Sequence, residues 1–452
     1  MDDFKPYIFK SKDKGKTWIA ISSTIPENYT VHSIQQDHKE ANVLFIGTEF
    51  GVFTSLNGGK KWIQLKSGIP TIAVRDLAIQ ERENDLVLAT FGRGFYILDD
   101  YTPLRQLSES MLEKKEGHIF DIKDADMYVQ TSSRGNQGST YYVAENPKYG
   151  AHIRYYVKDV PKSSKAERKE KEKELFKEGA FIPQPSWRDV ELEALEEGAH
   201  LIFTIKDADG NAVRTLTKKA SKGLGKIVWD LRYPSPRPII TDKFNPAAES
   251  KPGWPVMPGK YSITMQMWHN DSLTELAGPA SFNVKKLFED DITEEERKEI
   301  AAFDQKVSNM VRVSNAVSKS IKESNKKVAS MLQTMYNMDE IPEAEVAKAR
   351  TLLKELEDLR FKMEGVNAKA SWEEIPPSQM PISKRVSAVA YARYASTGKV
   401  TEKEKVGYDI AKEEMQAVID ELSIIIKNKI SGIESQLESM GATWTPGRIP
   451  KW

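Results

Sequence analysis

The chain has 452 residues, about three times the ~150 of an average domain, so two to four domains are expected. Its 66 basic residues balance 66 acidic ones, and this lack of basic excess argues against a dedicated nucleic-acid or anionic-membrane binder. The absence of cysteine excludes disulfides, thiolate metal sites and cysteine nucleophiles.

The first hundred residues contain a repeat. Segment 7–18, YIFKSKDKGKTW, aligns with segment 51–62, GVFTSLNGGKKW, at an offset of about 44 residues. A second pair of segments, 31–48 and 74–90, aligns at a similar offset and consists of short β-rich runs separated by turn residues. A repeat of ~40–50 residues built from short strands is typical of a β-propeller blade. Residues 1–105 are therefore predicted to form the last blades of a β-propeller.

Each repeat carries the pattern S-x-D/N-x-G-x-x-W, which resembles the Asp-box (BNR) repeat of sialidase-like and sortilin-like β-propellers. The short Asp or Asn side chain is expected to cap backbone N–H groups in its turn, and Gly to supply a positive φ. We interpret the polar residues as turn braces rather than metal or sugar ligands, because the turn already uses their side chains. The structural Asp-box residues are Ser11, Asp13, Gly15 and Trp18 in one copy and Ser55, Asn57, Gly59 and Trp62 in the other.

The third copy, at 92–100, has degenerated, since Leu98 replaces the serine and no Trp follows. A propeller normally needs ~4–8 blades, more than residues 1–105 can form. We therefore expect the missing blades to lie on the N-terminal part of a longer parent or on a partner chain. The resemblance implies an extracytoplasmic location (bacterial periplasm, cell surface or secreted), although this chain shows neither a signal peptide nor an apolar run long enough for a membrane span.

Residues 118–287 are predicted to form a β-sandwich, because short alternating strands are separated by polar Gly or Pro turns. The motifs NPxYGA, DxxGxxVRTL, WDLRY and PGxY resemble an Ig-like module that follows Asp-box propellers in bacterial proteins often labelled glycosyl hydrolases. Trp229 and Asp230 of WDLRY are interpreted as a core residue and a turn cap rather than catalytic residues. A charged insertion at 160–180 is either a solvated helix or a flexible segment, and its balanced charge argues against a basic binding patch.

From residue 291 to 440 apolar residues recur every three or four residues instead of every second residue, which predicts an antiparallel helical bundle. Thr293 followed by three glutamates is a helix start signal, and Pro342 restarts a second helix. No Glu-x-x-His pair is present in residues 291–440, so the apolar stripes are interpreted as core and no metal is expected there. The tail, 441–452, resembles the natural C-terminus of the same bacterial group.

Two classes of function compete. No nucleotide-binding, zinc-protease or hydrolase motif is present, so no cofactor and no catalytic residue is assigned. Arg75, Arg93 and Tyr96 lie in strand regions of the kind that a sialidase uses, but outside a recognisable sialidase motif; Arg93 and Glu49 are the candidate ligand-facing residues. The favoured hypothesis is a non-catalytic C-terminal scaffold that recognises a protein, peptide or glycan. The alternative is the accessory part of a sialidase-like glycoside hydrolase.

Overall fold

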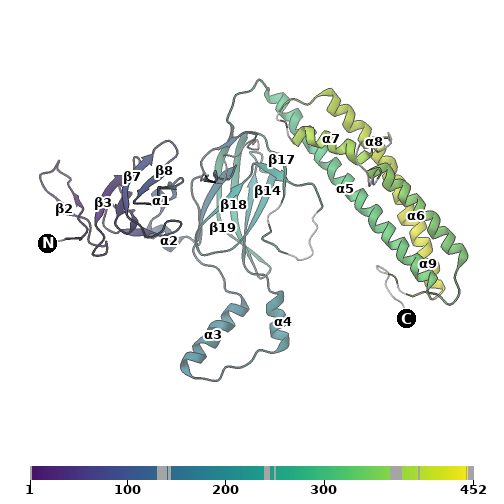
Figure 1. The fold of residues 1–452 in the computed structure, drawn as a ribbon, viewed down its shortest axis with the longest axis horizontal. Coiled ribbons are helices and arrows are strands. Elements are labelled where there is room, and N and C mark those ends of the chain that lie inside the picture. The colour runs from purple at the N-terminus through teal and green to yellow at the C-terminus, as the bar shows by residue number, and fades with distance from the viewer. Residues whose placement is uncertain are drawn as a thin grey trace.

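The computed structural model describes residues 3–129, 140, 144–238, 245–248, 251–366, 379–394, 396, 398–443 and 445. These residues have a mixed α/β multidomain architecture. Small sheets lie at the N-terminal end, larger sheets lie in the middle, and long helices lie toward the C-terminus (Figure 1). Among the described helices, none combines the length and apolar character needed to cross a membrane. Most of the predicted tail, including Trp444 and 446–452, lies outside the described residues.

The N-terminal strands form two antiparallel sheets and a short hairpin. We call the four-stranded sheet β3-β4-β5-β6 the first repeat sheet and the three-stranded sheet β7-β8-β9 the second repeat sheet, while β1 pairs only with β2. The strands are β1 (Phe9–Lys10), β2 (Ile19–Ala20), β3 (Val31–Gln36), β4 (Leu44–Thr48), β5 (Gly51–Ser55), β6 (Ile63–Leu65), β7 (Val74–Gln80), β8 (Asp85–Thr90) and β9 (Phe95–Leu98).

The first repeat sheet is buried on both faces. Every residue of β4 and β5 is buried, because alternate side chains of these strands enter two different cores. One core lies between the two repeat sheets and contains Val43, Phe45, Val52, Val74, Leu77, Leu86, Leu88 and Tyr101. The other lies on the opposite face and contains Ile8, Ile25, Leu44, Ile46, Phe53 and Trp62.

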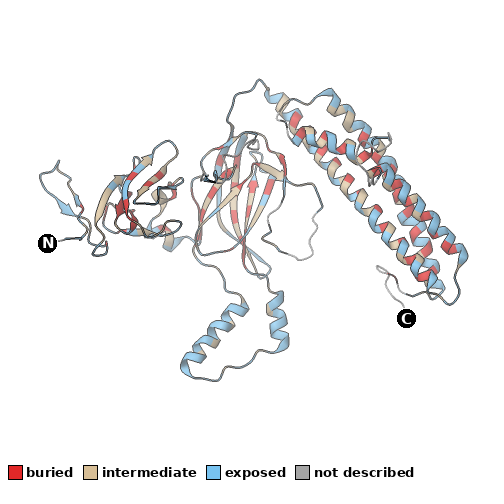
Figure 2. Cartoon of the chain, viewed as in Figure 1, coloured by how far each residue is buried: buried red, intermediate tan, exposed pale blue. Residues whose placement is uncertain are grey.

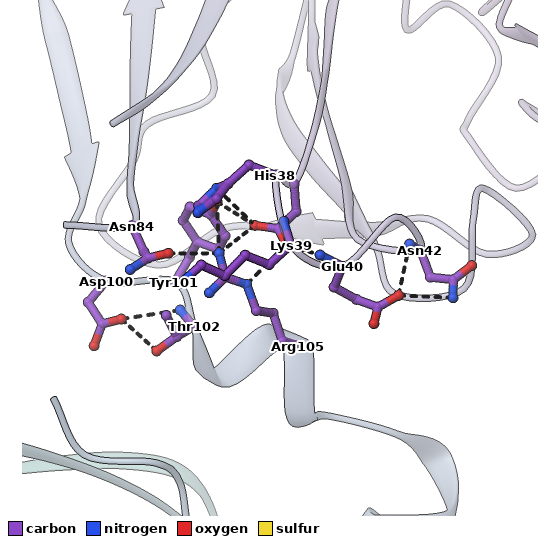
Figure 3. A network of polar contacts seen from close by, with 10 residues as sticks. His38, Lys39, Glu40, Asn42, Asn84, Asp100, Tyr101, Thr102 and Arg105 are labelled. Carbon is purple, nitrogen blue, oxygen red and sulfur yellow. Dashed lines mark hydrogen bonds and ion pairs between the residues drawn. The ribbon is translucent and has the colours of Figure 1, made fainter. Parts of the chain in front are cut away.

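A polar cluster ties the chain segment after β9 back to the repeat sheets (Figure 3). We call Asp37, Asn84, Tyr101 and Arg105 the clasp. The Tyr101 hydroxyl donates to Asp37 Oδ2 at 2.6 Å, and Arg105 of helix α1 (Pro103–Gln106) reaches both Asp37 carboxylate oxygens at 3.0 and 2.7 Å. Arg105 also donates to Asn84 Oδ1 at 2.7 Å. Because Asp37 has no exposed side-chain surface, these bonds replace the water that its carboxylate has lost.

The middle of the chain contains two sheets that share one core. Their strand orders are β10-β12-β15 and β11-β19-β18-β13-β14. Ile153 and Tyr155 of the smaller sheet pack with Leu201, Phe203 and Met265 of the larger one. The elements of this region are helix α2 (Glu109–Lys114) and strands β10 (Gly117–Ile119), β11 (Ala125–Met127), β12 (Ala151–Val157), β13 (His200–Lys206), β14 (Ala212–Lys219), β15 (Gly223–Trp229), β16 (Arg232–Pro234), β17 (Pro252–Pro255), β18 (Gly259–His269) and β19 (Ser272–Lys286).

The charged insertion is helical and longer than the predicted 160–180. Helix α3 (Ser164–Glu178) and helix α4 (Trp187–Leu195) form an arm that projects from the sheets, and neither helix has a buried residue (Figures 1 and 2). A Ser186–Asp189 capping box starts α4. Arg168 of α3 reaches Glu193 of α4 at 2.6 Å, so an ion pair rather than an apolar stripe holds the two helices together.

The C-terminal helices pack around one apolar core. Thr293 caps the first of them in a capping box with Glu296, and the second begins directly after Pro342. Buried residues from all these helices contribute to the core (Figure 2). The helices are α5 (Glu294–Tyr336), α6 (Glu343–Glu364), α7 (Ile382–Tyr394), α8 (Glu402–Ile424), the π-helical segment η2 (Ile425–Ile430) and α9 (Ser431–Ser439).

Aromatic contacts join the middle sheets to the helices. Tyr394 of α7 lies under the Arg232 guanidinium at 4.5 Å and contacts Trp254 of β17 edge-on. Next to it, the buried Arg393 pairs with Asp304 at 2.7 Å. Burial raises the pKa of Asp304, although the bond from Arg393 opposes this effect. Strand β17 lies in a Pro-rich segment, where it is short and anchored by Trp254.

We expect the clasp to stabilise the N-terminal sheets in a pH-dependent way. Burial raises the pKa of Asp37, but bonds from Arg105 and Tyr101 outweigh it and hold this pKa well below the ordinary value. The stabilisation is therefore complete above the unfolded-state pKa of about 4 and is lost as the pH falls through and below that value. Asp37→Asn should lower the free energy of unfolding by about 3–5 kcal/mol at pH 7, because a partly buried Arg105 loses its charge partner.

The measurement is calorimetric unfolding of the full chain at pH 7 and pH 3, following the transition of the N-terminal sheets. The difference between Asp37→Asn and wild type should shrink at pH 3. Glu81→Gln, at an exposed position on the same sheets, is the control and should change neither transition. An equal loss of stability at both pH values would contradict the role assigned to the Asp37 charge.

Candidate functional site

The two repeat sheets carry the same backbone irregularity at the same place. Val31 pairs with Thr48 and Ser33 with Gly47, so His32 is an extra residue between two ladder pairs. In the second repeat Val74 pairs with Thr90 and Asp76 with Ala89, so Arg75 is the extra residue. A β-bulge of this kind changes the direction of a side chain without ending the strand. The repeat therefore places His32 and Arg75 at equivalent positions.

These two residues meet because β3 and β7 lie side by side. Arg75 Nη1 lies 3.2 Å from His32 Nε2 and 3.3 Å from His32 Nδ1. Glu49, which follows β4, reaches His32 Nε2 at 2.8 Å and Arg75 Nη2 at 3.5 Å. We call His32, Glu49 and Arg75 the bulge triad. It is a polar cluster at one end of the neighbouring strands β3 and β7, beside the apolar core between the two repeat sheets.

The bulge triad is open to solvent on one side. The Arg75 side chain is 47% exposed, whereas His32 is largely covered. The Phe91 ring, in the turn between β8 and β9, lies 5.5 Å from the Arg75 guanidinium carbon and is itself exposed. Arg93 belongs to the same turn and is also exposed. An exposed guanidinium beside an aromatic face can contact an anionic group and an apolar or sugar ring at the same time.

Close backbone contact fixes the distance between the two repeat sheets at this point. A Cβ added to Gly47 would lie 2.5 Å from the Val74 carbonyl oxygen and 2.7 Å from Ser33 Oγ. Only glycine leaves room there for β7 to approach β4. Gly47 therefore acts as a positioning residue, because the approach that it permits brings Arg75 to His32.

Of the ligand-binding candidates named from the sequence, some belong to the bulge triad and others lie near it. Glu49 belongs to the triad, and Arg93 lies in the neighbouring turn between β8 and β9. Tyr96, on β9, packs against the core between the repeat sheets instead. Sequence reasoning missed His32. The bulge at Arg75 has a sequence signal, a break in the alternation of β7, where the buried Val74 and Leu77 are separated by two residues instead of one. The repeat extends this signal to His32, which occupies the equivalent position of β3.

The Asp-box turns use the same hydrogen bonds in both copies. Asp13 Oδ1 accepts from the Thr17 N–H at 2.8 Å, and Asn57 Oδ1 accepts from the Lys61 N–H at 2.9 Å. In each copy the serine hydroxyl accepts from the glycine N–H, for Ser11 at 2.6 Å and for Ser55 at 2.9 Å. The hydroxyl and N–H of Thr17 lower the pKa of Asp13 to about 2.

The glycines and tryptophans of the two copies differ in their surroundings. Gly15 and Gly59 both have positive φ, of 86° and 91°. Trp62 is buried and donates from its indole to the Ile21 carbonyl at 2.7 Å, whereas Trp18 is exposed.

Trp229 and Asp230 have structural surroundings. The Trp229 ring is fully buried and its indole donates to the Arg232 carbonyl at 3.1 Å. Asp230 accepts from the Arg232 N–H at 3.2 Å, and burial raises its pKa. A Cβ on Gly150 would collide with the Trp229 carbonyl oxygen, so the backbone of the adjacent strand is packed tightly against this turn. These contacts account for both residues without a catalytic role.

Within the described part of the chain, no group of three or more His, Cys, Asp or Glu side chains has the arrangement of a metal site. The bulge triad contains one carboxylate, that of Glu49, and this carboxylate is paired with His32 and Arg75. The chemistry available there is charge-assisted hydrogen bonding to a ligand, since a glycosidase generally requires two carboxyl groups or a tyrosine with a carboxylate.

No protein-family model matches the chain, and neither does any curated protein. Structural similarity is found to the extracellular domain of BT4673 from B. thetaiotaomicron, which is described in one structure as a one-component system and in another as a hybrid two-component system. It is also found to the extracellular domain of the BT3049 hybrid two-component system of the same organism.

These matches are distant. The two BT4673 structures are 10% identical over 62% of this chain, with TM-scores of 0.18 and 0.17. The BT3049 structure is 8% identical over 61% of this chain, with a TM-score of 0.19. The aligned part spans only 28–29% of the sensor chains. Nothing in the function proposed for this chain rests on so low a structural similarity.

The packing at Gly47 gives a test of how the triad is assembled. Gly47→Val should force β7 away from β4, since the Val74 carbonyl is backbone and cannot rotate aside. We expect a loss of about 1–3 kcal/mol in the free energy of unfolding of the N-terminal sheets. Loss of the contact between His32 and Arg75 should also change the NMR signals of the His32 ring.

Ala89→Val is the matched control, because Ala89 occupies the position equivalent to Gly47 in the second repeat. Ala89 is only half-buried, so this substitution should alter neither stability nor the His32 signals. Unchanged His32 signals in a folded Gly47→Val protein would contradict the positioning role of Gly47.

Proposed function

We propose that this chain is a non-catalytic scaffold and binding portion of an extracytoplasmic Asp-box propeller protein, and that the end of its repeat sheets near the bulge triad contacts the ligand. The repeated bulge carries this proposal. Two adjacent repeats have a β-bulge at the same position, and the two bulged residues, His32 and Arg75, lie in one polar cluster. Such an arrangement adds nothing to either apolar core, which supports a role in recognition.

The charge of this end favours an anionic ligand. Arg75 and Arg93 supply two guanidinium groups, whereas Glu49 supplies one carboxylate that is already engaged by His32 and Arg75. Phe91 adds an exposed apolar face directly beside Arg75. A ligand with a carboxylate next to an apolar or sugar ring, such as an acidic glycan or an acidic peptide, suits this combination.

The alternative, a sialidase-like hydrolase, receives less support. Its chemistry needs a second catalytic group near Glu49, and the contacts of Glu49 run to a histidine and an arginine. The carboxylate of Asp76, on the same strand as Arg75, accepts from the N–H of Leu77. The full chain is therefore expected to show no turnover of sialosides or other aryl glycosides.

The binding proposal is tested by saturation-transfer NMR on the full chain with sialyllactose, oligogalacturonate and an acidic peptide as probes. At least one of these carboxylate-bearing probes should bind, and Arg75→Ala should weaken that binding about tenfold, the usual scale of one charge-assisted contact. Arg82→Ala is the control, because Arg82 is also cationic and is even more exposed than Arg75, but it lies in the turn between β7 and β8.

Three outcomes would contradict the proposal. The first is that no probe binds, and the second is that Arg75→Ala and Arg82→Ala have equal effects. The third is hydrolysis of an aryl glycoside by the wild-type chain that Glu49→Gln or Arg93→Ala abolishes, since this would place an active site on the same sheets.

A further inference from the structure

A cavity lies where the middle sheets meet the C-terminal helices. Its volume is about 350 Å³, at the lower end of the ~300–1,000 Å³ typical of small-molecule sites. The ends of β11 and β19 and the segment after β17 line it together with the first turns of α5 (Figure 1). All of its lining residues lie between Met127 and Ser396, so it is separate from the bulge triad. Sites for small ligands often form at such junctions between domains.

Much of the cavity wall is apolar. Val256 of the middle region and Ile300 of α5 are both buried there. Tyr128 and Phe288 also line the cavity, and both of these aromatic residues are exposed. A wall of this kind suits a ligand that has a ring or a short apolar chain.

Most of the charged groups in the wall already have partners. Asp290 pairs with Lys286 at 3.0 Å and also with Arg297. The bond from Lys286 is the main cause that lowers the pKa of Asp290 to about 2. Because Asp290 engages both cations, neither is free for an anionic ligand. Glu289 is exposed to solvent.

Asp304 differs from the other charged residues of the wall. It lies one turn after Ile300 on α5, and only 13% of its side chain is exposed. Its Oδ1 accepts from Arg393 Nε at 2.7 Å, whereas among the described residues no donor is bonded to its Oδ2. Arg393 is shared as well, since it lies 3.6 Å from Glu404 and donates to the Gly398 carbonyl at 3.1 Å.

One guanidinium therefore serves two carboxylates. The charged lining residues, together with Arg393 and Glu404, supply three positive and four negative charges. Burial raises the pKa of Asp304 although the bond from Arg393 opposes this effect, so its charge is only partly compensated. A buried carboxylate in this condition is stabilised by a further cation that donates hydrogen bonds to it.

We propose that this cavity binds a small organic amine in its protonated form, with the ammonium group bonded to Asp304 and an apolar ring packed against Val256 and Phe288. The ammonium group supplies the missing positive charge and has three N–H donors, one of which can reach Oδ2. Tyr128 adds a second aromatic ring, and an aromatic face attracts a cation as well as an apolar ring.

The test uses the full chain and three probes of nearly equal size, namely phenethylamine, 2-phenylethanol and phenylacetate. They share one ring and differ in charge, which is positive, zero and negative at pH 7.5. Ligand-observed NMR titration should show saturable binding of phenethylamine, at least tenfold tighter than that of 2-phenylethanol, the usual scale of one charge-assisted contact. Phenylacetate should bind no more tightly than the alcohol.

Asp304→Asn should lower the affinity for phenethylamine to that for 2-phenylethanol and leave the affinity for the alcohol unchanged. A cavity that had lost its structure would lose both probes, so the two probes together separate loss of charge from loss of folding. Glu299→Gln is the matched control on the same helix, because Glu299 pairs with Lys405 outside the cavity. It should bind both probes like wild type.

Met257→Trp keeps the proposal testable if Asp304→Asn fails to fold. Met257 lines the cavity, and the larger side chain should fill part of it and weaken the binding of phenethylamine at least tenfold. Met440→Trp, at the exposed end of α9, is its control and should leave binding unchanged. Circular dichroism establishes that all variants are folded.

The proposal is overturned if phenethylamine shows no saturable binding, or if it binds no more tightly than 2-phenylethanol or phenylacetate. It is also overturned if a folded Asp304→Asn protein keeps the preference for the amine, or if Met257→Trp binds the amine like wild type. These outcomes do not depend on the glycan and acidic-peptide probes, because the residues of the bulge triad lie outside this cavity.

Discussion

The close approach of the two repeat sheets is the constraint on which the N-terminal part of the molecule depends. Gly47 lets the Val74 carbonyl lie where a side chain would otherwise be, and the apolar side chains of both sheets meet in one core. Because the sheets are fixed at this distance, two bulges that would be local defects in separate sheets instead face each other. The His32–Arg75 contact is thus a consequence of packing as much as of sequence.

The clasp explains why the second repeat ends as it does. In the first repeat the chain continues from β5 into a turn and a fourth strand, β6. After β9 of the second repeat, Tyr101 instead enters the core and its hydroxyl bonds to Asp37. Arg105 then fixes helix α1 against the turns of both repeats. The segment that would form the fourth strand is used to close one end of the sheets. The apolar edge of β9 is left uncovered as a result.

Local patterns predicted much of the fold. The repeat offset indicated the recurring β-sheets, and the Thr293 and Pro342 signals located the starts of long helices, because caps and apolar periodicity depend on neighbouring residues. Helix α4 was missed, since its apolar residues are exposed and an ion pair to α3 holds it. Strand β17 was missed because a Pro-rich sequence opposes strand assignment, whereas packing of Trp254 overrides it.

The candidate site was only partly predictable. Glu49 and Arg93 were named from the sequence as candidate ligand-facing residues, but the triad depends on a one-residue bulge and on contact between segments more than forty residues apart. No local sequence pattern predicts which neighbouring residue a bulged side chain will contact. The clasp is a similar case, because Asp37 and Arg105 are far apart in sequence and meet only in the folded chain.

The central claim is that the first repeat is complete and the second has an open edge. Hydrogen exchange on the full chain, resolved to single amides by NMR, tests it most directly. Amides of Val52 and Thr54 should exchange slowly because they face β6, and those of Phe95 and Ile97 should exchange near the rate of unstructured backbone. Equal and strong protection at all four positions would contradict the account, because it would mean that the edge of β9 is already paired.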